Sequence, residues 1–387
     1  MIAPTYIELD REKFQENVSF LKDYIGREAA FCSVIKGNAY GHGIKEFVPM
    51  AEDCGIDYFG VFSDHEAQAA LEARKSEETE IMIMGMVSSD NMPWAIRNGI
   101  SFFVFEPDRL RDALDTAREL SLKARIHLHL ETGMNRLGLD RDRLEEVVRL
   151  VRGNEDKLSL EGLCTHYAGA ESVSNHVRVT RQIQRFEERC RELKQEGLKP
   201  RYRHSACSAA ALNYPETVHD LVRIGIAQYG FWPNRETYMN FVKKHTGIDK
   251  KHRDPLQRVL SWKSQVMSTK SVDAGEFVGY GNTYLTSRDQ KIATVPVGYS
   301  HGYGRNLTNT GRVLIRGQRA QVAGLVNMNM LTVDVTDIEG VRKGDEVVII
   351  GRQGENEMTV ASFSEMTNYM NYEVLTRLPS SIPRTVV

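Results

Sequence analysis

The sequence predicts an α/β fold, with an N-terminal (β/α)8 TIM-type barrel and a C-terminal domain made mainly of β-strands. Three observations support this prediction. Over the first 230 residues, short apolar runs alternate with amphipathic helical stretches. Beyond residue 255, strand-like runs continue without long helical patterns between them. The length of 387 residues exceeds one ordinary core, which favours two domains, here residues 1–240 and 241–387.

Eight apolar runs in the first part have the length and composition of short buried strands. Helical stretches lie between most of them; 65–75 and 108–120 are the clearest, and Pro107 with Asp108 marks the start of the second. Eight such units match a (β/α)8 barrel. The alternative is an open doubly wound sheet, which usually carries a G-x-G-x-x-G loop that is absent here. The eight runs are 31–36, 58–63, 80–85, 101–106, 125–131, 160–166, 201–207 and 221–230.

The segments after residue 255 alternate or run apolar over a few residues, with glycine-rich turns between them, until a helical pattern returns at 361–372. This pattern is typical of a β-domain, and the first strand, at about residues 1–10, could pack on it. The connection 232–255 is long and basic, and a solvated linker or helix explains its charge better than a binding patch.

Composition excludes several classes of protein. The net charge of -2 and the pI of about 6.6 favour neither nucleic acid nor an anionic membrane surface as partner. Five cysteines without a C-x-x-C pair indicate neither a disulfide framework nor a zinc site, so no metal is expected. The N-terminus lacks an apolar signal segment and no run approaches 18 apolar residues, so we expect a cytoplasmic protein.

Lys36 ends the first barrel strand and opens the motif K-G-N-A-Y-G-H-G. Residues at the carboxyl ends of barrel strands face the active site. Most lysines are only solvated charges, but an apolar strand delivers this one and three glycines let the chain turn tightly behind it. A desolvated amine loses its proton more easily, which suits a Schiff-base nucleophile that then acts as a base. Lys36 is therefore a candidate catalytic residue.

The motif at 36–43 resembles the pyridoxal phosphate attachment motif of the alanine racemase family, and the similarity extends from Thr5 and Tyr6 to Tyr372 and beyond. The resemblance implies that pyridoxal 5′-phosphate is held on Lys36. It also implies a cytoplasmic homodimer with active sites at the interface, which interconverts L- and D-alanine and so supplies D-alanine for the cell wall. Neither nucleic acid nor a membrane is implied as a partner.

The segment V-G-Y-G-N-T-Y (278–284) resembles the family segment that supplies a second catalytic base, by match Tyr280. Racemisation removes a proton from one face of the substrate Cα and delivers one to the other. A single base cannot easily reach both faces, so an amine and a phenol on opposite sides suit the reaction. In the family this tyrosine reaches across the dimer interface.

L-V-R-I-G-I (221–226) resembles the segment whose arginine, here Arg223, faces the pyridine nitrogen. A guanidinium only donates hydrogen bonds, so the ring nitrogen should stay unprotonated, which weakens the cofactor as an electron sink and limits side reactions such as transamination. Its apolar neighbours require that Arg223 has some partner. The other cofactor contacts are expected from the hydroxyls of Tyr40, Ser208 and Tyr372, the backbone N–H groups of Gly225 and Ile226, and His166, which could also orient Arg223.

E-T-G-M-N-R-L-G (131–138) resembles the family's D-T-G-M-x-R-x-G, whose arginine, here Arg136, would bond the cofactor phenolate or the substrate carboxylate. By the same resemblance, Tyr299 narrows the substrate entrance and the backbone of Met328 helps to bind the substrate carboxylate.

Three positions depart from the family pattern. His129 stands where many alanine racemases have a carbamylated lysine that holds the arginine, so Arg136 must be held by a bound anion or another carboxylate. Asn329, in N-M-N, and His301, in G-Y-S-H-G-Y, stand where aspartates are common. These changes leave open a broad-specificity, serine or basic amino-acid racemase.

Other classes fit less well. A non-catalytic pyridoxal phosphate-binding barrel would resemble the N-terminal part alone, and the β-domain with Tyr280 argues against it. A basic amino-acid decarboxylase of the same architecture uses a cysteine in its C-terminal domain, and no cysteine follows Cys207. A purely structural role has little support.

Overall fold

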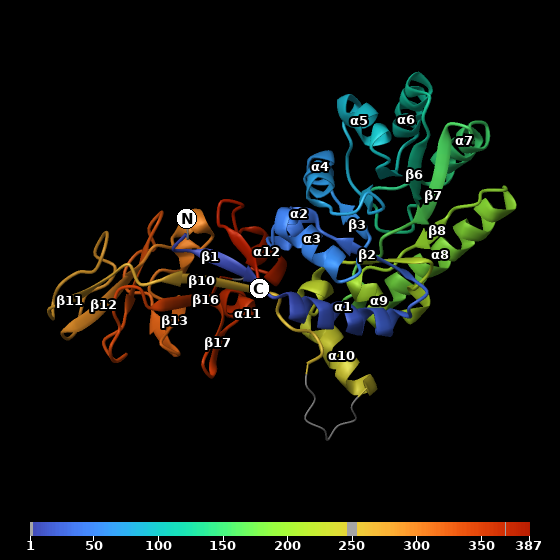
Figure 1. The fold of residues 1–387 in the computed structure, drawn as a ribbon. Helices are drawn as coiled ribbons and strands as arrows, with labels where there is room; N and C mark the ends of the chain where they lie inside the picture. Colours follow the sequence, from blue (N-terminus) through green and yellow to red (C-terminus); the bar gives the residue numbers. More distant parts are fainter. Residues whose placement is uncertain (1–2, 246–253, 368) are drawn as a thin grey trace. The chain divides into compact units, whose positions relative to one another are not determined.

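The computed structural model describes residues 3–245, 254–367 and 369–387 and divides into two compact units (Figure 1). The barrel unit contains Glu12–Lys36 and Val48–Gln257. The sheet unit contains Met1–Arg11, Gly37–Phe47 and Arg258–Val387. The domain boundary between residues 240 and 241 stays a prediction.

The barrel unit is built on eight parallel strands in the order β8-β7-β6-β5-β4-β3-β2-β9, which confirms the predicted N-terminal barrel. The barrel is nearly closed, because β9 meets the segment that follows β8 through a single bridge, Cys207 to Arg223, rather than through a ladder. Their bounds are β2 Ala30–Val34, β3 Tyr58–Val61, β4 Glu80–Ile83, β5 Ser101–Val104, β6 Ala124–His129, β7 Leu158–Cys164, β8 Tyr202–His204 and β9 Leu221–Ile224.

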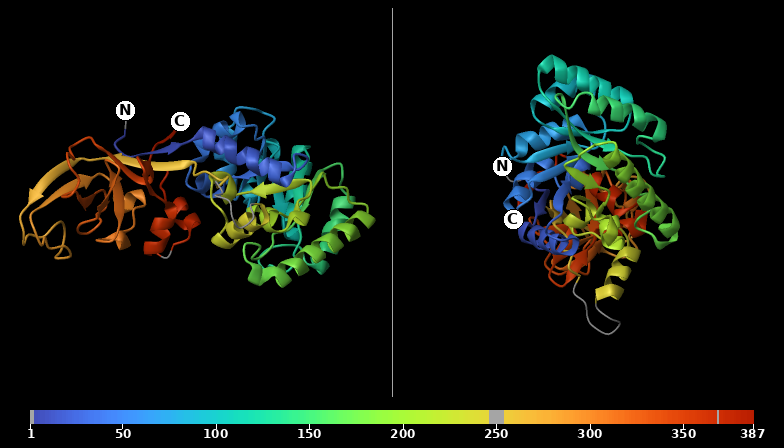
Figure 2. Two further views of the ribbon diagram at one scale, coloured as in Figure 1. Left: turned by 90° about the horizontal axis from the view of Figure 1, so that it is seen from below. Right: turned by 90° about the vertical axis from the view of Figure 1, so that its right-hand side faces the viewer.

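Helices follow the strands and lie on the outside of the barrel (Figure 2). Helix α6 begins at Pro107, as predicted, and buries one face that includes Leu110, Leu114 and Ala117. Part of the basic connection 232–255 forms α10, and residues 246–253 of that connection lie outside the described residues. The bounds are α1 Arg11–Ile25, α3 Ile44–Asp53, α4 Asp64–Ala73, α5 Met92–Arg97, α6 Pro107–Leu120, α7 Arg141–Arg152, α8 His176–Gln195, α9 Ser208–Asn213 and α10 Arg235–His245, with 3-10 helices at Ser89–Asn91, Val173–Asn175, Pro215–Thr217 and Ile226–Tyr229.

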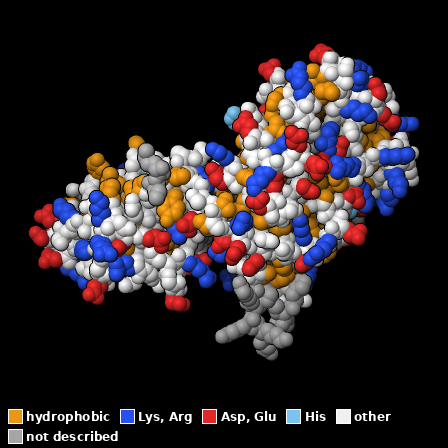
Figure 3. Space-filling view, in the orientation of Figure 1, with side chains coloured by type: hydrophobic (Ala, Val, Ile, Leu, Met, Phe, Trp, Pro, Cys, Tyr) orange, Lys and Arg blue, Asp and Glu red, His pale blue; other side chains and the backbone are white. Residues whose placement is uncertain are grey.

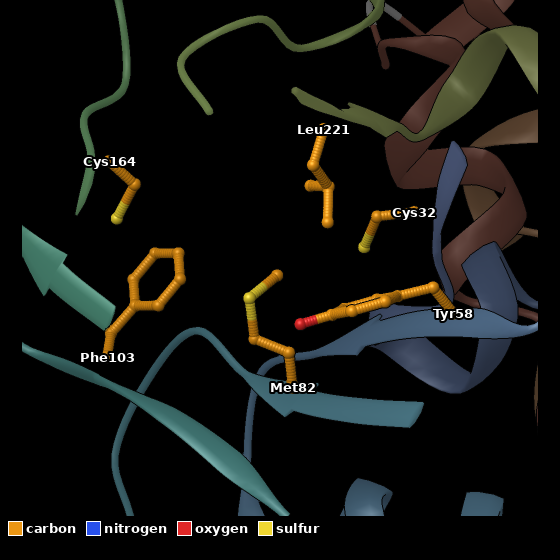
Figure 4. Close-up of a cluster of buried hydrophobic side chains, with 6 residues drawn as sticks. All are labelled: Cys32, Tyr58, Met82, Phe103, Cys164 and Leu221. Carbon is orange, nitrogen blue, oxygen red and sulfur yellow. The ribbon is translucent and has the colours of Figure 1, made fainter. Parts of the chain in front are cut away.

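The barrel interior is filled by side chains rather than open as a pore. Six strands contribute one buried side chain each to a cluster shown in Figure 4. The remaining two strands, β6 and β8, contribute His127 and His204, which are also fully buried. The six side chains of the cluster are Cys32, Tyr58, Met82, Phe103, Cys164 and Leu221.

The sheet unit is mainly β, as predicted. A seven-stranded sheet has the order β14-β13-β16-β10-β1-β18, with β17 beside β16, and a three-stranded sheet has the order β11-β12-β15. The strand expected near residues 1–10 is β1, and it pairs with β10 and β18. The bounds are β1 Tyr6–Leu9, β10 Leu260–Gln265, β11 Ser268–Val272, β12 Gln290–Val295, β13 Arg312–Ile315, β14 Gln318–Gln321, β15 Leu331–Asp334, β16 Glu346–Gln353, β17 Asn356–Met358 and β18 Arg384–Val386; helices are α11 Val360–Thr367 and α12 Asn371–Thr376, with 3-10 helices at Tyr299–His301 and Arg305–Leu307.

Within the described residues, every helix is too short or too polar to cross a membrane. On the face seen in Figure 3, acidic and basic side chains are interspersed, in keeping with the net charge near zero. No disulfide joins any of the five cysteines, which all lie in the described residues.

Candidate active site

Lys36 lies two residues beyond the carboxyl end of β2, which ends at Val34, so the strand is slightly shorter than predicted but still delivers Lys36 to its carboxyl end. The side chain is exposed in the single chain, but its amine lies among barrel residues. The resulting loss of hydration lowers the pKa of Lys36, and the nearby charge of Arg136 lowers it further, while Cys207 and Glu66 act in the opposite direction. A larger fraction of the amine is therefore unprotonated near neutral pH than for an ordinary lysine.

Within α2 (Lys36–Tyr40), the four residues 37–40 form a left-handed turn immediately after Lys36. Gly37, Asn38, Ala39 and Tyr40 have φ angles of 63°, 54°, 53° and 51°. Residues with a Cβ adopt this conformation at a cost of about 1–2 kcal/mol each, so the surroundings must hold it. Backbone strain of this kind is concentrated at functional sites.

Side chains and backbone groups hold this turn in place. The Ile44 N–H donates to Oδ1 of Asn38 at 3.0 Å, and the His42 ring nitrogen Nδ1 lies 3.0 Å from the Ala39 carbonyl oxygen. Gly41 allows close approach of the backbone, since a Cβ there would lie 2.0 Å from the Leu375 carbonyl oxygen. Only glycine fits this position.

Arg223 lies on β9 and is buried, with 4 % of its surface exposed. Its NH1 group donates to Nδ1 of His204 at 2.6 Å and to the His204 carbonyl at 2.8 Å. Its NH2 group donates to the carbonyls of Thr165 at 2.6 Å and Ser205 at 3.2 Å. The partners that the sequence required for Arg223 are thus the His204 ring and three backbone carbonyls. These four hydrogen bonds use the NH1 and NH2 groups and leave out the Nε–H group of Arg223.

His204 was not predicted from the sequence, and the predicted candidate for orienting Arg223, His166, makes none of these four bonds. His166 nevertheless lies near Arg223. Burial is the main cause that lowers the pKa of this histidine to about 3, and the charges of Arg223, Arg136 and Lys36 contribute in that order. His166 is therefore neutral and lies in a group that contains three cations. Lys36, Arg136 and Arg223 form no ion pair with a carboxylate of the described chain, which suits an anionic ligand.

His129 ends β6 and its ring stacks on Phe103, with centroids 5.5 Å apart. Burial, then Arg223 and Arg136, lowers the pKa of His129 to about 3, and its Nδ1 has no hydrogen-bond partner among the described residues. Arg136 forms no ion pair with a carboxylate of the described residues, and what holds Arg136 stays a prediction.

The residues predicted to bind phosphate fall into two groups. In the barrel unit, Ser208 begins α9 and its hydroxyl oxygen accepts the Gly225 N–H at 2.9 Å, with Ile226 next in the chain. In the sheet unit, the rings of Tyr40 and Tyr372 lie against each other, with centroids 5.9 Å apart. Within each unit, the structure brings the predicted residues together.

Tyr280 is 73 % exposed, in the loop between β11 and β12. Gly279 and Gly281 on either side of it have φ angles of 76° and 66°. Tyr299 and Met328 are also exposed and are adjacent, because the Tyr299 and Ser300 N–H groups donate to the carbonyls at positions 327 and 328. The sheet unit thus presents three predicted site residues at its surface.

Ser300 lies between Asn329 and His301, the two positions of this unit that depart from the family pattern, and its hydroxyl is within hydrogen-bond distance of both side chains. Asn329 donates to the Ser300 hydroxyl at 3.0 Å, and that hydroxyl donates to the Met328 carbonyl at 2.7 Å. Nδ1 of His301 accepts the Gly298 N–H at 3.2 Å, and burial lowers the pKa of His301. The positions where aspartates are common in the family therefore form a neutral polar surface here.

Two domain families, the N- and C-terminal domains of alanine racemase, match the chain. The alanine racemase N-terminal domain matches residues 9–233, and the alanine racemase C-terminal domain matches residues 259–386.

Curated relatives match over nearly the full chain. Alanine racemase of Leptospira interrogans (serogroup Icterohaemorrhagiae, serovar copenhageni) is 34% identical over 386 residues, covering 99% of this chain and 96% of the relative. Alanine racemase of Symbiobacterium thermophilum is 35% identical over 394 residues, covering 99% of this chain and 97% of the relative.

Solved structures agree with these matches. An alanine racemase of Clostridium difficile superposes with a TM-score of 0.90 at 26% identity, over 100% of this chain and 96% of that one. An alanine racemase of Bacillus anthracis with bound L-Ala-P superposes with a TM-score of 0.88 at 29% identity, again over 100% and 96%.

Proposed function

Because the chain belongs to the alanine racemase family and is an alanine racemase, an isomerase, we propose that it works with pyridoxal 5′-phosphate held on Lys36. The single observation that supports this most is the place of Lys36, an amine with a lowered pKa at the carboxyl end of a barrel strand. In this proposal Lys36 and Tyr280 are the two bases.

The residues present fit the cofactor. Lys36, Arg136 and Arg223 are cations without carboxylate partners in the described chain, and pyridoxal phosphate is an anion with an aldehyde that combines with an amine. We assign the contact with its ring nitrogen to Arg223. When bound, the cofactor withdraws electrons from the substrate Cα and so makes its proton acidic. The phosphate contacts are assigned to Ser208, Gly225, Ile226, Tyr40 and Tyr372, and His166 is placed beside the cofactor.

Arg223 would limit the reaction to proton exchange. Its guanidinium stays charged and can only donate, so an acceptor facing it remains unprotonated. A ring nitrogen without a proton is a weaker electron sink, which disfavours transamination. Arg136, Tyr299 and the backbone of Met328 are assigned to the substrate, and its carboxylate would meet the charge of Arg136.

Tyr280 acts on the face of Cα opposite Lys36 and is supplied by a partner subunit. This part of the proposal is supported by its exposure of 73 % and by exposed apolar side chains of the same unit, which would be buried in a homodimer. The lack of disulfides among the five cysteines, all of them described, suits the reducing cytoplasm, where we place the enzyme. The exposed apolar side chains are Phe277, Leu285, Met328 and Met330.

Borohydride reduction of the purified enzyme, followed by peptide mapping, tests the cofactor assignment. Cofactor trapped on Lys36 is expected, and cofactor on any other lysine contradicts the proposal. Lys36→Ala should abolish racemisation of L-alanine as followed by circular dichroism. A panel with L-serine and L-lysine decides between alanine and broader specificity.

Tyr280→Phe tests the second base. Loss of a positioned base typically costs 10²–10⁴-fold, so kcat should fall at least about 100-fold, while cofactor trapping on Lys36 is retained. Tyr284→Phe, in the same loop, removes a hydroxyl that only accepts from Gln290 at 3.1 Å and is the matched control. Equal activity in the two variants would refute the role of Tyr280.

A further inference from the structure

A continuous line of hydrogen bonds extends from Arg223 into the barrel interior. NH1 of Arg223 meets Nδ1 of His204 at 2.6 Å, and Nε2 of His204 lies 2.9 Å from Nδ1 of His127. Nε2 of His127 in turn lies 3.2 Å from the Ser101 hydroxyl, and that hydroxyl donates to the Ile81 carbonyl at 3.4 Å. The line connects side chains of β9, β8, β6 and β5.

The direction of this line follows from its first member. A guanidinium has no acceptor, so Nδ1 of His204 must accept and carry no proton. If the ring is neutral, its proton is then on Nε2 and is donated to Nδ1 of His127. The same reasoning places the His127 proton on Nε2, from which it is donated to Ser101. Each link therefore determines the tautomer of the next.

The surroundings keep both rings neutral and fixed. Burial lowers the pKa of His127 to about 3 and holds that of His204 well below its ordinary value. The ring of Phe103 packs against both, with centroids 6.0 and 5.9 Å away. Among the charged groups that act on the pKa of His127, the one that raises it is Glu161, which is itself paired with Arg125 at 3.0 Å.

Gly162 on β7 makes room for the contact between the two rings. A Cβ at this position would lie 2.3 Å from Nδ1 of His127 and 2.7 Å from Nε2 of His204, the two atoms that the hydrogen bond joins. Any side chain here would push the rings apart. The barrel thus carries a glycine at the place where this link requires space.

We propose that Arg223, His204, His127 and Ser101 form one hydrogen-bond chain of fixed polarity, which orients Arg223 and stabilises its charge in place of a carboxylate. Both imidazoles direct their unprotonated nitrogen toward the guanidinium, so their dipoles are aligned to favour its charge. A carboxylate at that place would cancel much of the field of Arg223 beyond it. His204 and His127 are therefore positioning residues.

The link to activity rests on the proposed function, in which Arg223 meets the ring nitrogen of the cofactor. Four of its five N–H donors are committed to His204, Thr165 and Ser205, which directs the remaining Nε–H. A change at His127 acts on the cofactor only through His204 and Arg223.

The tautomers are measured directly by ¹⁵N solid-state NMR of the full-length enzyme with labelled histidines. His127 and His204 are assigned from the signals lost in His127→Asn and His204→Asn. We expect both rings to be neutral, with a protonated Nε2 and an unprotonated Nδ1. Detection of either ring as the Nδ1–H tautomer or as imidazolium would overturn the proposal, and this measurement needs no variant to retain activity.

A matched pair at His127 tests the positioning role. His127→Asn keeps an acceptor near the place of Nδ1, whereas His127→Phe removes it. We expect His127→Phe to lower kcat on the order of tenfold, with little change in KM, and to shift the absorbance of the bound cofactor. His127→Asn should stay within about threefold of the parent enzyme. Equal impairment of the two variants would show that the acceptor has no such role.

Gly162→Ala tests the same link without touching a polar group, and its kinetics should resemble those of His127→Phe. His219→Phe is the control, because His219 is a mostly buried histidine of the same unit that pairs with Glu187 instead and should leave the kinetics unchanged. Parent-like kinetics in Gly162→Ala would overturn the positioning role. Cofactor trapped on a lysine other than Lys36 would refute the proposed function while leaving the tautomers as expected, so the two failures are distinguishable.

Discussion

At Lys36, the chemistry of one amine depends on neighbours that are distant in sequence. Arg136 follows β6 and Arg223 lies on β9, yet both lower the pKa of Lys36 by their charge. The sequence predicted that Lys36 stands at the carboxyl end of a barrel strand, because an apolar run that ends in a lysine can be recognised locally. The local pattern does not relate Lys36 to Arg136 or Arg223; only the family resemblance placed both arginines beside the cofactor expected on Lys36.

We expect this electrostatic effect to be measurable in the cofactor-free protein. Below the ordinary lysine pKa of 10.5, a lowered pKa leaves a larger fraction of Lys36 unprotonated and reactive. Removing a neighbouring positive charge in Arg136→Gln should raise that pKa again, so the pH profile of Lys36 labelling by an amine reagent should move to higher pH. Mass spectrometry of the Lys36 peptide gives the profile, and an unchanged profile would contradict the assignment.

His204 shows why part of the site was missed. R-Y-R-H-S-A-C reads as a short strand, and nothing in its spacing relates position 204 to position 223. The relation appears only when β8 and β9 lie side by side in the barrel, with Arg223 bridged to Cys207. The apolar residues around Arg223 did predict that a partner exists, since an unpaired buried guanidinium would be too costly.

At the scale of an element, the turn at 37–40 differs from what its glycines suggest. Gly37, Gly41 and Gly43 indicated a tight turn, and all three have positive φ. The sequence did not indicate that Asn38, Ala39 and Tyr40 share this conformation. Hydrogen bonds from Ile44 and His42, a few residues further on, compensate for the local preference, and the close approach of Gly41 to Leu375 is the tertiary constraint that the sequence does not indicate.

Because the backbone approaches Leu375 closely at Gly41, substitution of Gly41 should destabilise the protein more than substitution of other glycines with positive φ. Gly41→Ala places a Cβ 2.0 Å from the Leu375 carbonyl oxygen, whereas at Gly26, with a similar φ of 86°, nothing lies within 4 Å. We expect Gly26→Ala to lower the free energy of unfolding by about 1 kcal/mol and Gly41→Ala by about 3 kcal/mol. Urea unfolding followed by circular dichroism measures both, and equal losses would show that the turn can relax.

At the scale of the whole molecule, a group of ion pairs lies toward the amino ends of the barrel strands, away from Lys36. Arg125 pairs with Glu80 and, at 3.0 Å, with Glu161, and Arg201 lies 2.7 Å from Glu80. Residues at this end of a barrel serve stability rather than catalysis. Burial alone would raise the pKa of Glu161, but hydrogen bonding to Arg125 and its charge outweigh burial and lower it.

The contribution of Glu161 to stability should therefore depend on pH. A folded-state pKa below the ordinary value of 4.5 means that the contribution is present above that value and is lost as the pH falls through the folded pKa. Glu161→Gln should lower the free energy of unfolding by about 2 kcal/mol at pH 7, and the difference should shrink below about pH 4.

Denaturant unfolding at both pH values checks this expectation. Glu119→Gln is the control, because Glu119 is exposed on α6 and its loss should change the free energy little at either pH. A Glu161→Gln deficit that stays constant with pH would mean that its charge is not the cause.

Seven of the eight barrel strands were predicted within a few residues, because buried parallel strands produce short continuous apolar runs; the eighth run, 221–230, extends six residues past β9 into a 3-10 helix. The division of the chain into units was harder to predict. Residues 37–47 belong to the sheet unit although both flanking segments belong to the barrel unit. Periodicity identifies a strand or helix but does not identify its partners, which can come from any distance along the chain.

The place of β1 between β10 and β18 also has a consequence during synthesis on the ribosome. Leu9 pairs with Leu260 and Val386, so its first partner is translated roughly 250 residues later. At about 5–20 residues per second, β1 waits for about 12–50 s, long enough for the intervening barrel to begin folding. Ile7 and Leu9, fully buried in the finished enzyme, are exposed on the nascent chain throughout that time and offer a binding segment to chaperones.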